Sequence, residues 1–228
     1  MTKSKFVNGY QVYYDDYDFR WTKAIGPAAR EWEMRLGTDF TTGAEYTNTQ
    51  AGTSPTVQAI TAGDRALLTT GGTENNGCNL QVVGTPIQIA SGKPFYFGAK
   101  VSISDATETD FLVGLASTDT SLFAAHAITV INCAAFSKID GGTAILASTI
   151  KASSVSAATV GTVMDTAKHI YEIYFDGTTL YYYFDAGLVT SMTSGWPTVV
   201  LTPSIALMAG AAAAKTALVE WMRCIQLP

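Results

Sequence analysis

Apolar and polar residues alternate along most of the chain after Gly37. The clearest alternation covers residues 95–103, where large apolar side chains occupy every second position. A period of two places alternate side chains on opposite faces of a β-strand, so this segment predicts a half-buried strand. The same pattern predicts three further strands, which carry Phe111, Val113 and Leu115, then Ile205, Leu207 and Ala209, then Ala217, Val219 and Trp221.

Residues 169–185 predict a β-hairpin, because Asp176-Gly177 separates two alternating runs and Asp-Gly is a strong hairpin signal. A loop of two or four residues places one apolar set on a single face: Tyr171, Ile173, Phe175, Leu180, Tyr182 and Phe184. A loop of three residues without a bulge would set these residues against the opposite face, so we exclude it. The other face then carries Ile170, Glu172, Tyr174, Tyr181 and Tyr183.

No segment shows sustained apolar residues at the spacing of a helix. Residues 26–34 fit one turn of helix that starts at Pro27, but Trp32, Met34 and Leu36 also alternate as in a strand. Residues 69–79 and 148–163 are rich in small polar residues and predict loops or exposed strands. We therefore predict an all-β fold, a two-sheet antiparallel sandwich over residues 15–228, preceded by a short N-terminal arm of residues 1–14.

Composition narrows the class of protein. The chain has 228 residues, of which 47% are hydrophobic and only 14% charged, and this excludes a disordered chain or a coiled coil. A formal net charge of -5 argues against a nucleic-acid partner, because phosphates need a basic surface. Charged residues concentrate in residues 1–35, and the sparse charge elsewhere predicts a surface that contacts other protein.

The three cysteines, Cys78, Cys133 and Cys224, lie far apart and form no Cys-x-x-Cys pair, so we expect buried thiols. The N-terminal residues contain no apolar signal core, which predicts synthesis in the cytoplasm without export. The longest apolar stretch, residues 205–219, includes Lys215 and is shorter than the ~20 residues that cross a bilayer. We expect no membrane partner.

Acidic residues offer little for catalysis. Retaining glycoside hydrolysis needs two carboxyl groups ~5–5.5 Å apart. Glu31 and Glu33 would share one side of a strand but have no further acidic partner, so we expect a solvated face. Glu172 and Glu220 are lone acids that we expect at the rim of a sheet.

The remaining polar residues predict neither a triad nor a metal site. His126 and His169 are far apart and have no acidic neighbour at local spacing, so a nucleophilic triad is unsupported. An extended run would split the acids of residues 15–18 between two faces, whereas calcium needs converging oxygens. We predict no catalytic residue, no metal and no cofactor.

Aromatic residues are the better candidates for binding. Tyr174, Tyr181 and Tyr183 share the face opposite the predicted core, beside Glu172. Such tyrosines stack on sugars, anchor protein interfaces or pack under another layer, and the sequence leaves these three roles open. Trp196, which precedes a proline in a loop, is expected to plug the core.

Several segments together resemble a known family. Residues 95–101 and 104–116, with residues 67–81, 171–185 and 201–216, resemble structural proteins of tailed phages, whose fold is similar to the concanavalin A-like or laminin G-like jelly roll. The similarity covers roughly residues 64–226. Neither the Glu-x-Asp-x-Glu pattern of glucanases with this fold nor the lectin-type Asp-x-Tyr-x-Asn spacing is present.

The resemblance implies a non-enzymatic virion protein, a decoration or cement protein that stabilises the capsid. Its partners would be the lattice of the major capsid protein and its own copies, most simply as a trimer. The arm would make these contacts through Phe6, Tyr10, Tyr13 and Tyr14, and the sheet through Tyr174, Tyr181 and Tyr183. The alternative is a glycan-binding module of a phage tail or fibre.

Overall fold

The computed structural model describes residues 3–7, 10–14, 46–52, 56–60, 65–83 and 87–226. Side chains are described for residues 46–52, 65–83, 87–224 and 226. Residues 15–36, with their competing helix and strand predictions and their acidic pairs, lie outside the described part. Phe6, Tyr10, Tyr13 and Tyr14 belong to described strands, but their side chains do not belong to the described set.

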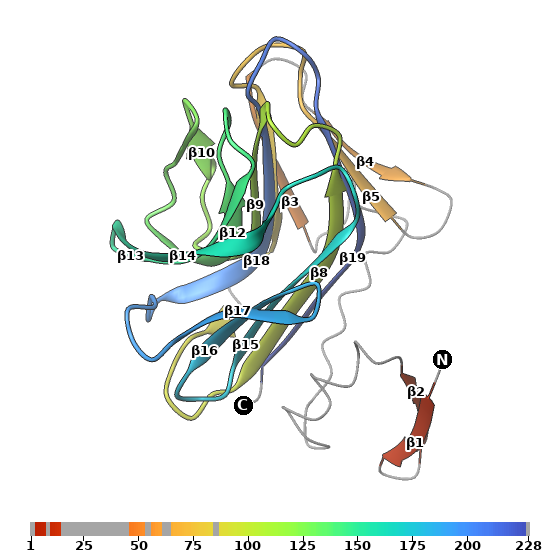
Figure 1. The fold of residues 1–228 in the computed structure, drawn as a ribbon, viewed down its shortest axis with the longest axis vertical. Helices are drawn as coiled ribbons and strands as arrows, with labels where there is room; N and C mark the ends of the chain where they lie inside the picture. The colour runs from red at the N-terminus through yellow and green to blue at the C-terminus, as the bar shows by residue number, and fades with distance from the viewer. Residues whose placement is uncertain are drawn as a thin grey trace.

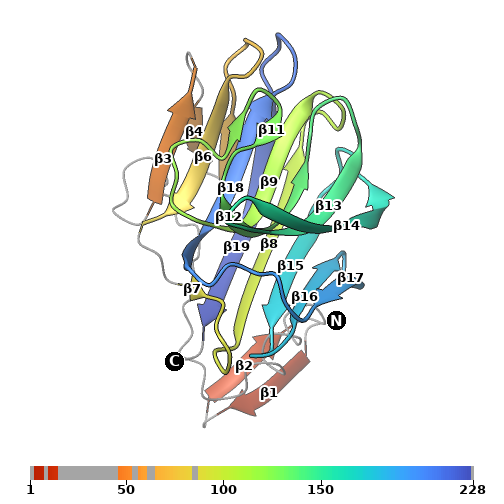
Figure 2. The ribbon, with the colours of Figure 1, turned by 90° about the vertical axis from the view of Figure 1, so that its left-hand side faces the viewer.

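Two large antiparallel sheets pack face to face, which confirms the all-β sandwich (Figure 1, Figure 2). The first sheet has the order β14 (Ser154–Val163), β13 (Ala144–Lys151), β12 (Asn132–Lys138), β9 (Thr109–Ala116), β18 (Val200–Ala209), β6 (Gly77–Val82) and β3 (Tyr46–Ala51), and β7 (Ile87–Gln88) also pairs with β18. The second sheet has the order β17 (Gly187–Met192), β16 (Leu180–Phe184), β15 (His169–Phe175), β8 (Phe95–Ile103), β19 (Thr216–Gln226), β5 (Arg65–Thr69) and β4 (Thr56–Ile60).

Two small hairpins accompany the sandwich. Strands β1 (Lys3–Val7) and β2 (Tyr10–Tyr14) pair with each other, so the backbone of the predicted N-terminal arm forms a hairpin. Strands β10 (Phe123–Ala124) and β11 (Ala127–Ile128) form the second. Within the described residues no helix is long and apolar enough to span a bilayer.

Aromatic rings fill the space between the two sheets. Phe136 on β12 lies at the centre, with ring centroids 5.4 Å from both Tyr171 and Tyr182 and 6.5 Å from Phe184. Tyr182 is fully buried, and its hydroxyl donates a 2.8 Å hydrogen bond to the carbonyl oxygen of Ser148. The rings therefore connect β12 of one sheet with β15 and β16 of the other, and the buried hydroxyl is satisfied.

The hairpin of β15 and β16 has the predicted register. Tyr171 pairs with Phe184, Ile173 with Tyr182, and Phe175 with Leu180, so the loop has four residues. The Asp176 carboxylate accepts hydrogen bonds of 2.7 Å from the backbone N–H groups of both Thr178 and Thr179. This side chain holds the loop closed, as aspartate does in many tight turns.

Strand β19 departs from the prediction at Trp221. Ala217 and Val219 face the core, but a β-bulge between Val219 and Trp221 inserts Glu220 and reverses the alternation. Met222 and Cys224 are buried beyond the bulge, and Trp221 lies on the outer face. The strand predicted from Ala217, Val219 and Trp221 is present, but Trp221 does not share the face of the other two, because a bulge adds one residue to a strand.

A second apolar cluster lies on the outer face of the first sheet, under the segment 117–131. It contains Leu112, Phe123, Cys133 and Met208, among others. Gln81 attaches the segment, because its amide donates to the carbonyl of Ser117 (3.3 Å) and accepts from the N–H of Asp119 (3.1 Å). The sequence analysis did not predict that residues 117–131 pack over the outer face of the first sheet.

All three cysteines are buried free thiols, as expected. Burial is the main cause that raises the pKa of Cys78 and of Cys133 to about 12, so both are protonated and unreactive at neutral pH.

The two segments expected as loops or exposed strands, residues 69–79 and 148–163, have different structures. Residues 77–79 begin the buried strand β6, whereas β14 is an exposed strand.

Candidate functional site

The tyrosine face lies on the outer side of the second sheet, as the hairpin register predicted. Glu172 pairs with Tyr183, and Tyr174 pairs with Tyr181. All three tyrosines are partly exposed. The rings of Tyr174 and Tyr181 stack with centroids 5.9 Å apart at 17°, and the Tyr181 hydroxyl donates to Asp176 at 3.3 Å. Each ring gives one face to the other, so the pair stabilises neighbouring strands and offers little open platform for a sugar.

The two acids of this sheet are already engaged. Glu172 is only 1% exposed and accepts a 3.0 Å hydrogen bond from the hydroxyl of Tyr96. Glu220 lies 2.8 Å from the ammonium of Lys100 and also pairs with Lys168. Both acids lie on interior strands of the sheet, so the expectation of rim positions was wrong.

The pKa of Glu220 shows which form this side chain takes. Partial burial, the largest single influence, raises the pKa, but the two lysines together hold it below its ordinary value. The group is therefore a paired carboxylate, unlike the protonated acid that glycoside cleavage requires.

Each histidine lies between two carboxylates. His126 contacts Asp110 at 2.8 Å through Nδ1 and Glu74 at 3.1 Å through Nε2. His169 contacts Asp185 at 2.7 Å and Asp165 at 3.0 Å. No acidic neighbour was expected at local spacing, and for His126 both carboxylates are indeed distant in sequence. For His169 that expectation was wrong, because Asp165 is only four residues before it. With both ring nitrogens engaged, neither imidazole has a nitrogen left to deprotonate a serine or cysteine. Among the described residues, no group of three or more acidic, histidine or cysteine side chains is arranged to hold a metal.

We expect the stability to fall as the pH rises above neutrality. The hydrogen bond with Asp110 is the largest cause that raises the pKa of His126. Burial, the largest influence on His169, lowers its pKa, but Asp185 and Asp165 outweigh it and the net shift is upward. Stabilisation by a histidine with a raised folded-state pKa is complete below the unfolded value of ~6.5 and is lost as the pH rises through the folded value.

Urea unfolding at a series of pH values measures this effect. The free energy of unfolding should decline above pH ~6.5 in the native protein. The double variant His126→Gln and His169→Gln should lose that part of the decline. The same slope in both proteins would contradict the assignment.

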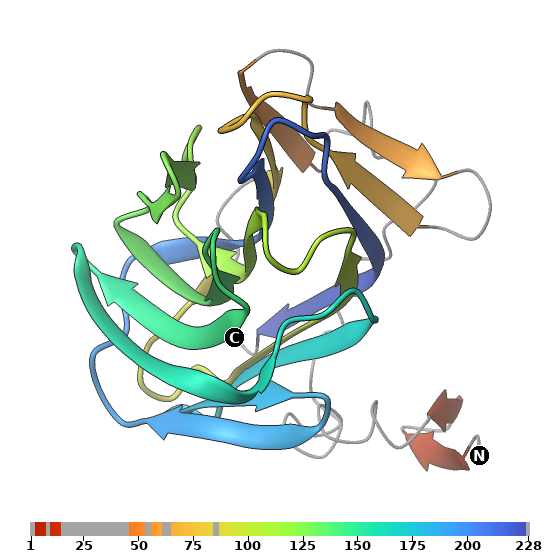
Figure 3. The ribbon, with the colours of Figure 1, turned by 45° about the horizontal axis from the view of Figure 1, so that its top comes forward.

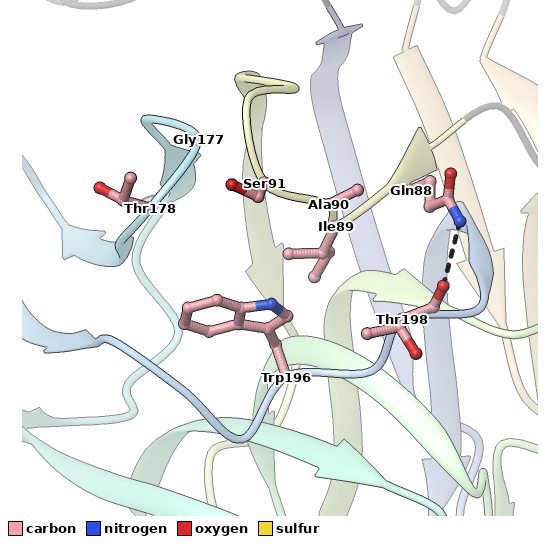
Figure 4. Close-up of a pocket in the computed structure, with 8 residues that line it drawn as sticks. All are labelled: Gln88, Ile89, Ala90, Ser91, Gly177, Thr178, Trp196 and Thr198. Atoms are coloured by element: carbon pink, nitrogen blue, oxygen red, sulfur yellow. Dashed lines mark hydrogen bonds between the residues drawn. The ribbon is translucent and has the colours of Figure 1, made fainter.

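A pocket of about 470 Å³ opens at one end of the sandwich (Figure 4). Three loops form it: residues 89–94 before β8, residues 176–179 between β15 and β16, and residues 193–199 before β18. Its lining residues are Gln88, Ile89, Ala90, Ser91, Gly177, Thr178, Trp196 and Thr198. None of these side chains carries a charge.

Trp196 is the largest side chain in the lining of the pocket. Its ring lies edge-on to Phe175 with a centroid separation of 5.3 Å, and it packs against the main core cluster. The expectation of a plug on the core is therefore confirmed. The indole is nevertheless partly exposed, and Figure 4 shows it opposite Ile89, between Thr178 on one side and Thr198 on the other. Among the described residues, no hydrogen bond is found for the indole N–H.

Hydrogen bonds hold the pocket walls in place. The N–H of Gly92 donates to the carbonyl of Gly177 at 3.0 Å and joins two of the three loops. Thr178 donates from its hydroxyl to Asp176 at 2.8 Å. Gln88 donates to the carbonyl of Thr198 at 3.2 Å, which connects the third loop. The pocket is therefore formed before any ligand enters, and the only sequence signal for it was a tryptophan in a loop.

Two loops of the pocket approach each other closely at Gly177. Gly177 has φ +100°, and a Cβ atom at this position would lie 3.3 Å from the backbone of Gly92. A larger residue would therefore push the two loops apart.

Neither a protein-family model nor a curated protein sequence matches this chain. Solved structures with the same fold include the carbohydrate recognition domain of Emp47p (TM-score 0.59, 9% identity, 85% of this chain and 93% of that one). A β-1,3-glucanase from Mycobacterium marinum matches with TM-score 0.57 and 12% identity over 82% of this chain and 94% of the glucanase. The carbohydrate-binding module CBM66 from Bacillus subtilis matches with TM-score 0.50 and 13% identity over 79% of this chain and 95% of the module.

At these low identities the similarity concerns the fold alone. The fold is the concanavalin A-like jelly roll that the sequence resemblance implied. These comparisons give no support to the virion assignment. Binding modules and enzymes both occur among the similar structures, so the chain has a lectin-like jelly-roll fold that is compatible with either activity.

Proposed function

We propose that this protein is a non-enzymatic carbohydrate-binding module that holds a neutral sugar in the pocket of Trp196. The observation that carries the proposal is a partly exposed indole, fixed edge-on to Phe175, in a preformed pocket lined only by uncharged residues. This corresponds to the glycan-binding alternative from the sequence, placed at a different site. A location in a phage particle is no part of the proposal.

The chemistry of the lining matches that of a sugar. The C–H groups on one side of a pyranose ring pack against an aromatic face, while its hydroxyls need donors and acceptors at the rim. Ser91, Thr178 and Thr198 are exposed and offer hydroxyl groups at the rim of the pocket. The volume of about 470 Å³ lies within the range of roughly 300–1,000 Å³ that small-molecule sites occupy.

The absence of charge in the lining separates a neutral sugar from an acidic one. A uronic or sialic acid that enters this pocket would lose hydration of its carboxylate without gaining a cation in return. Selectivity for neutral glycans therefore follows from desolvation.

Binding fits the pocket better than cleavage does. Glycoside hydrolysis uses two carboxyl groups on either side of the scissile bond, and the lining contains none. Asp176 is the acidic residue in the hairpin loop that forms one wall of the pocket. Its carboxylate accepts hydrogen bonds from the N–H groups of Thr178 and Thr179 and from the Thr178 hydroxyl, so it shapes the loop. The names of two of the similar structures, a carbohydrate recognition domain and a carbohydrate-binding module, add support for binding.

Truncation of the indole should abolish binding. We expect Trp196→Ala to cost about 2 kcal/mol of binding free energy, or roughly thirtyfold in Kd, because a central aromatic contact is lost. An array of neutral and acidic glycans identifies the ligand for the native protein, and calorimetry with the best neutral oligosaccharide then measures the variant. Tyr183→Ala on the outer face of the second sheet is the matched control, because Tyr183 is an aromatic residue of that face outside the pocket lining, and it should bind as the native protein does.

Three outcomes would contradict the proposal. The native protein would bind no neutral glycan, or would bind only acidic glycans, or Trp196→Ala would bind unchanged. If Tyr183→Ala loses binding while Trp196→Ala keeps it, the sugar lies on the tyrosine face instead of in the pocket.

A further inference from the structure

Strand β14 forms one edge of the first sheet and is unusually exposed. It pairs with β13 on one side, and no described strand pairs with it on the other (Figure 3). Of its ten residues, only Val160 is buried and Ala158 half-buried, while the rest are exposed. Both faces of the strand therefore meet solvent over most of its length, and its unpaired backbone groups lie on the open side.

The strand lacks the features that usually protect such an edge. Proteins block exposed edges with lysine, proline, short strands or an irregular backbone. β14 reads SVSAATVGTV and holds no charged residue and no proline. Its pairing with β13 is regular from Ser154 to Thr159 and shifts only beyond that point. Six consecutive residues thus remain available for regular pairing.

We propose that β14 pairs antiparallel with β14 of a second copy of this chain, so that the first sheet continues across a twofold axis. A twofold contact places the same strand on both sides, and antiparallel pairing of a strand with itself satisfies this symmetry. The unpaired N–H and C=O groups of both copies then bond to each other.

The side chains of β14 fit a second copy of themselves. Like charges that face each other across a symmetric pair are destabilising, and this strand carries none. Val155 is 64% exposed on the same face as Ala157, because these residues pair with Ile150 and Ser148 of β13. In the dimer, Val155 and Ala157 of the two copies lie on one continuous face and shield each other from water.

Self-association at this edge does not depend on sugar binding. The pocket of Trp196 is lined by the loops before β8 and β18 and by the hairpin loop of β15 and β16, and no residue of β14 contributes to it. A dimer would carry two such pockets and bind a repetitive glycan more tightly through avidity.

Charge-reversal variants test the pairing. Ala157 lies near the middle of the regular segment and is exposed, so replacing it leaves the core intact. Light scattering after size-exclusion chromatography should give twice the chain mass for the native protein. Ala157→Lys alone and Ala157→Glu alone should each give the chain mass, because like charges meet across the axis. An equimolar mixture of the two variants should return to twice the chain mass.

Val83→Lys provides the control, because Val83 is also a solvent-exposed apolar residue (50%) and directly follows β6, which four other strands separate from β14. This variant should keep the native mass. A native protein with the mass of one chain would overturn the proposal, and so would a dimer that persists in Ala157→Lys. Circular dichroism spectra identical to that of the native protein show that each variant is folded.

Discussion

Replacing Phe136 with alanine is expected to lower the free energy of unfolding by about 3–5 kcal/mol. The side chain is fully buried and touches Tyr171, Tyr182 and Phe184, so its removal leaves a cavity between the sheets. These three rings belong to the paired strands β15 and β16, and the pairing limits how far they can move into the cavity. Denaturation by urea, followed by tryptophan fluorescence, measures the loss.

Phe136→Leu separates the effect of the cavity from that of simple burial. Leucine keeps most of the apolar contact, so we expect a clearly smaller loss, about 1–2 kcal/mol. If alanine and leucine at this position cost the same, or if alanine costs less than about 1 kcal/mol, the ring is not the centre of the core.

Replacing Gly114 with alanine is expected to cost about 3 kcal/mol. Gly114 lies on β9 between β12 and β18, and its φ is +156°. A Cβ atom there would lie 2.5 Å from the carbonyl oxygen of Ala134 and 2.6 Å from the Cα of Ala135. Both are backbone atoms of the neighbouring strand, so no side-chain rotation relieves the clash and the sheet itself must move.

Gly142→Ala is the matched control for this substitution. A Cβ atom at Gly142 would meet no other atom within 4 Å, so the variant should unfold within about 0.5 kcal/mol of the native protein. Urea unfolding of both variants compares them directly. A native-like stability for Gly114→Ala would contradict the close approach of β9 and β12 at this position.

Alternation in the sequence was enough to predict several strands and their inward faces. Residues 95–103 and the hairpin of residues 169–185 agree with the structure in both extent and orientation, including Tyr174, Tyr181 and Tyr183 on the outer face. The rule succeeds here because a side chain's face depends only on its position along a regular strand.

The same rule failed where the strand is irregular. The bulge at Glu220 turned Trp221 outward, and nothing in the order of apolar and polar residues marks such an insertion. The histidines were misjudged for a related reason. Asp110 is sixteen residues from His126 and Asp185 is sixteen from His169, so the tertiary fold and not local spacing brings these carboxylates to the rings. Asp165, four residues before His169, is a local neighbour that the sequence analysis overlooked.

The candidate pocket could not be read from the sequence at all. Trp196 was correctly expected to contact the core, but Ile89 and Thr178 come from distant loops that meet it only in the folded chain. Tyr174 and Tyr181 stack on each other, which leaves less aromatic surface open to a sugar than the sequence suggested. This stacking depends on side-chain rotamers, which no pattern of residue types specifies.

The sequence by itself therefore determined the class of the fold, the local strands and the side of each strand that faces the core, because these follow from a period of two residues. The tertiary structure decided which strands became neighbours: β9 lies beside β18 and β8 beside β19, although the rest of the second half of the sandwich separates each pair in the sequence. Many strands of this chain are equally apolar on one face, so alternation does not choose among partners. Packing of the whole sandwich makes that choice, and with it places the loops that form the Trp196 pocket and leaves the edge of β14 open.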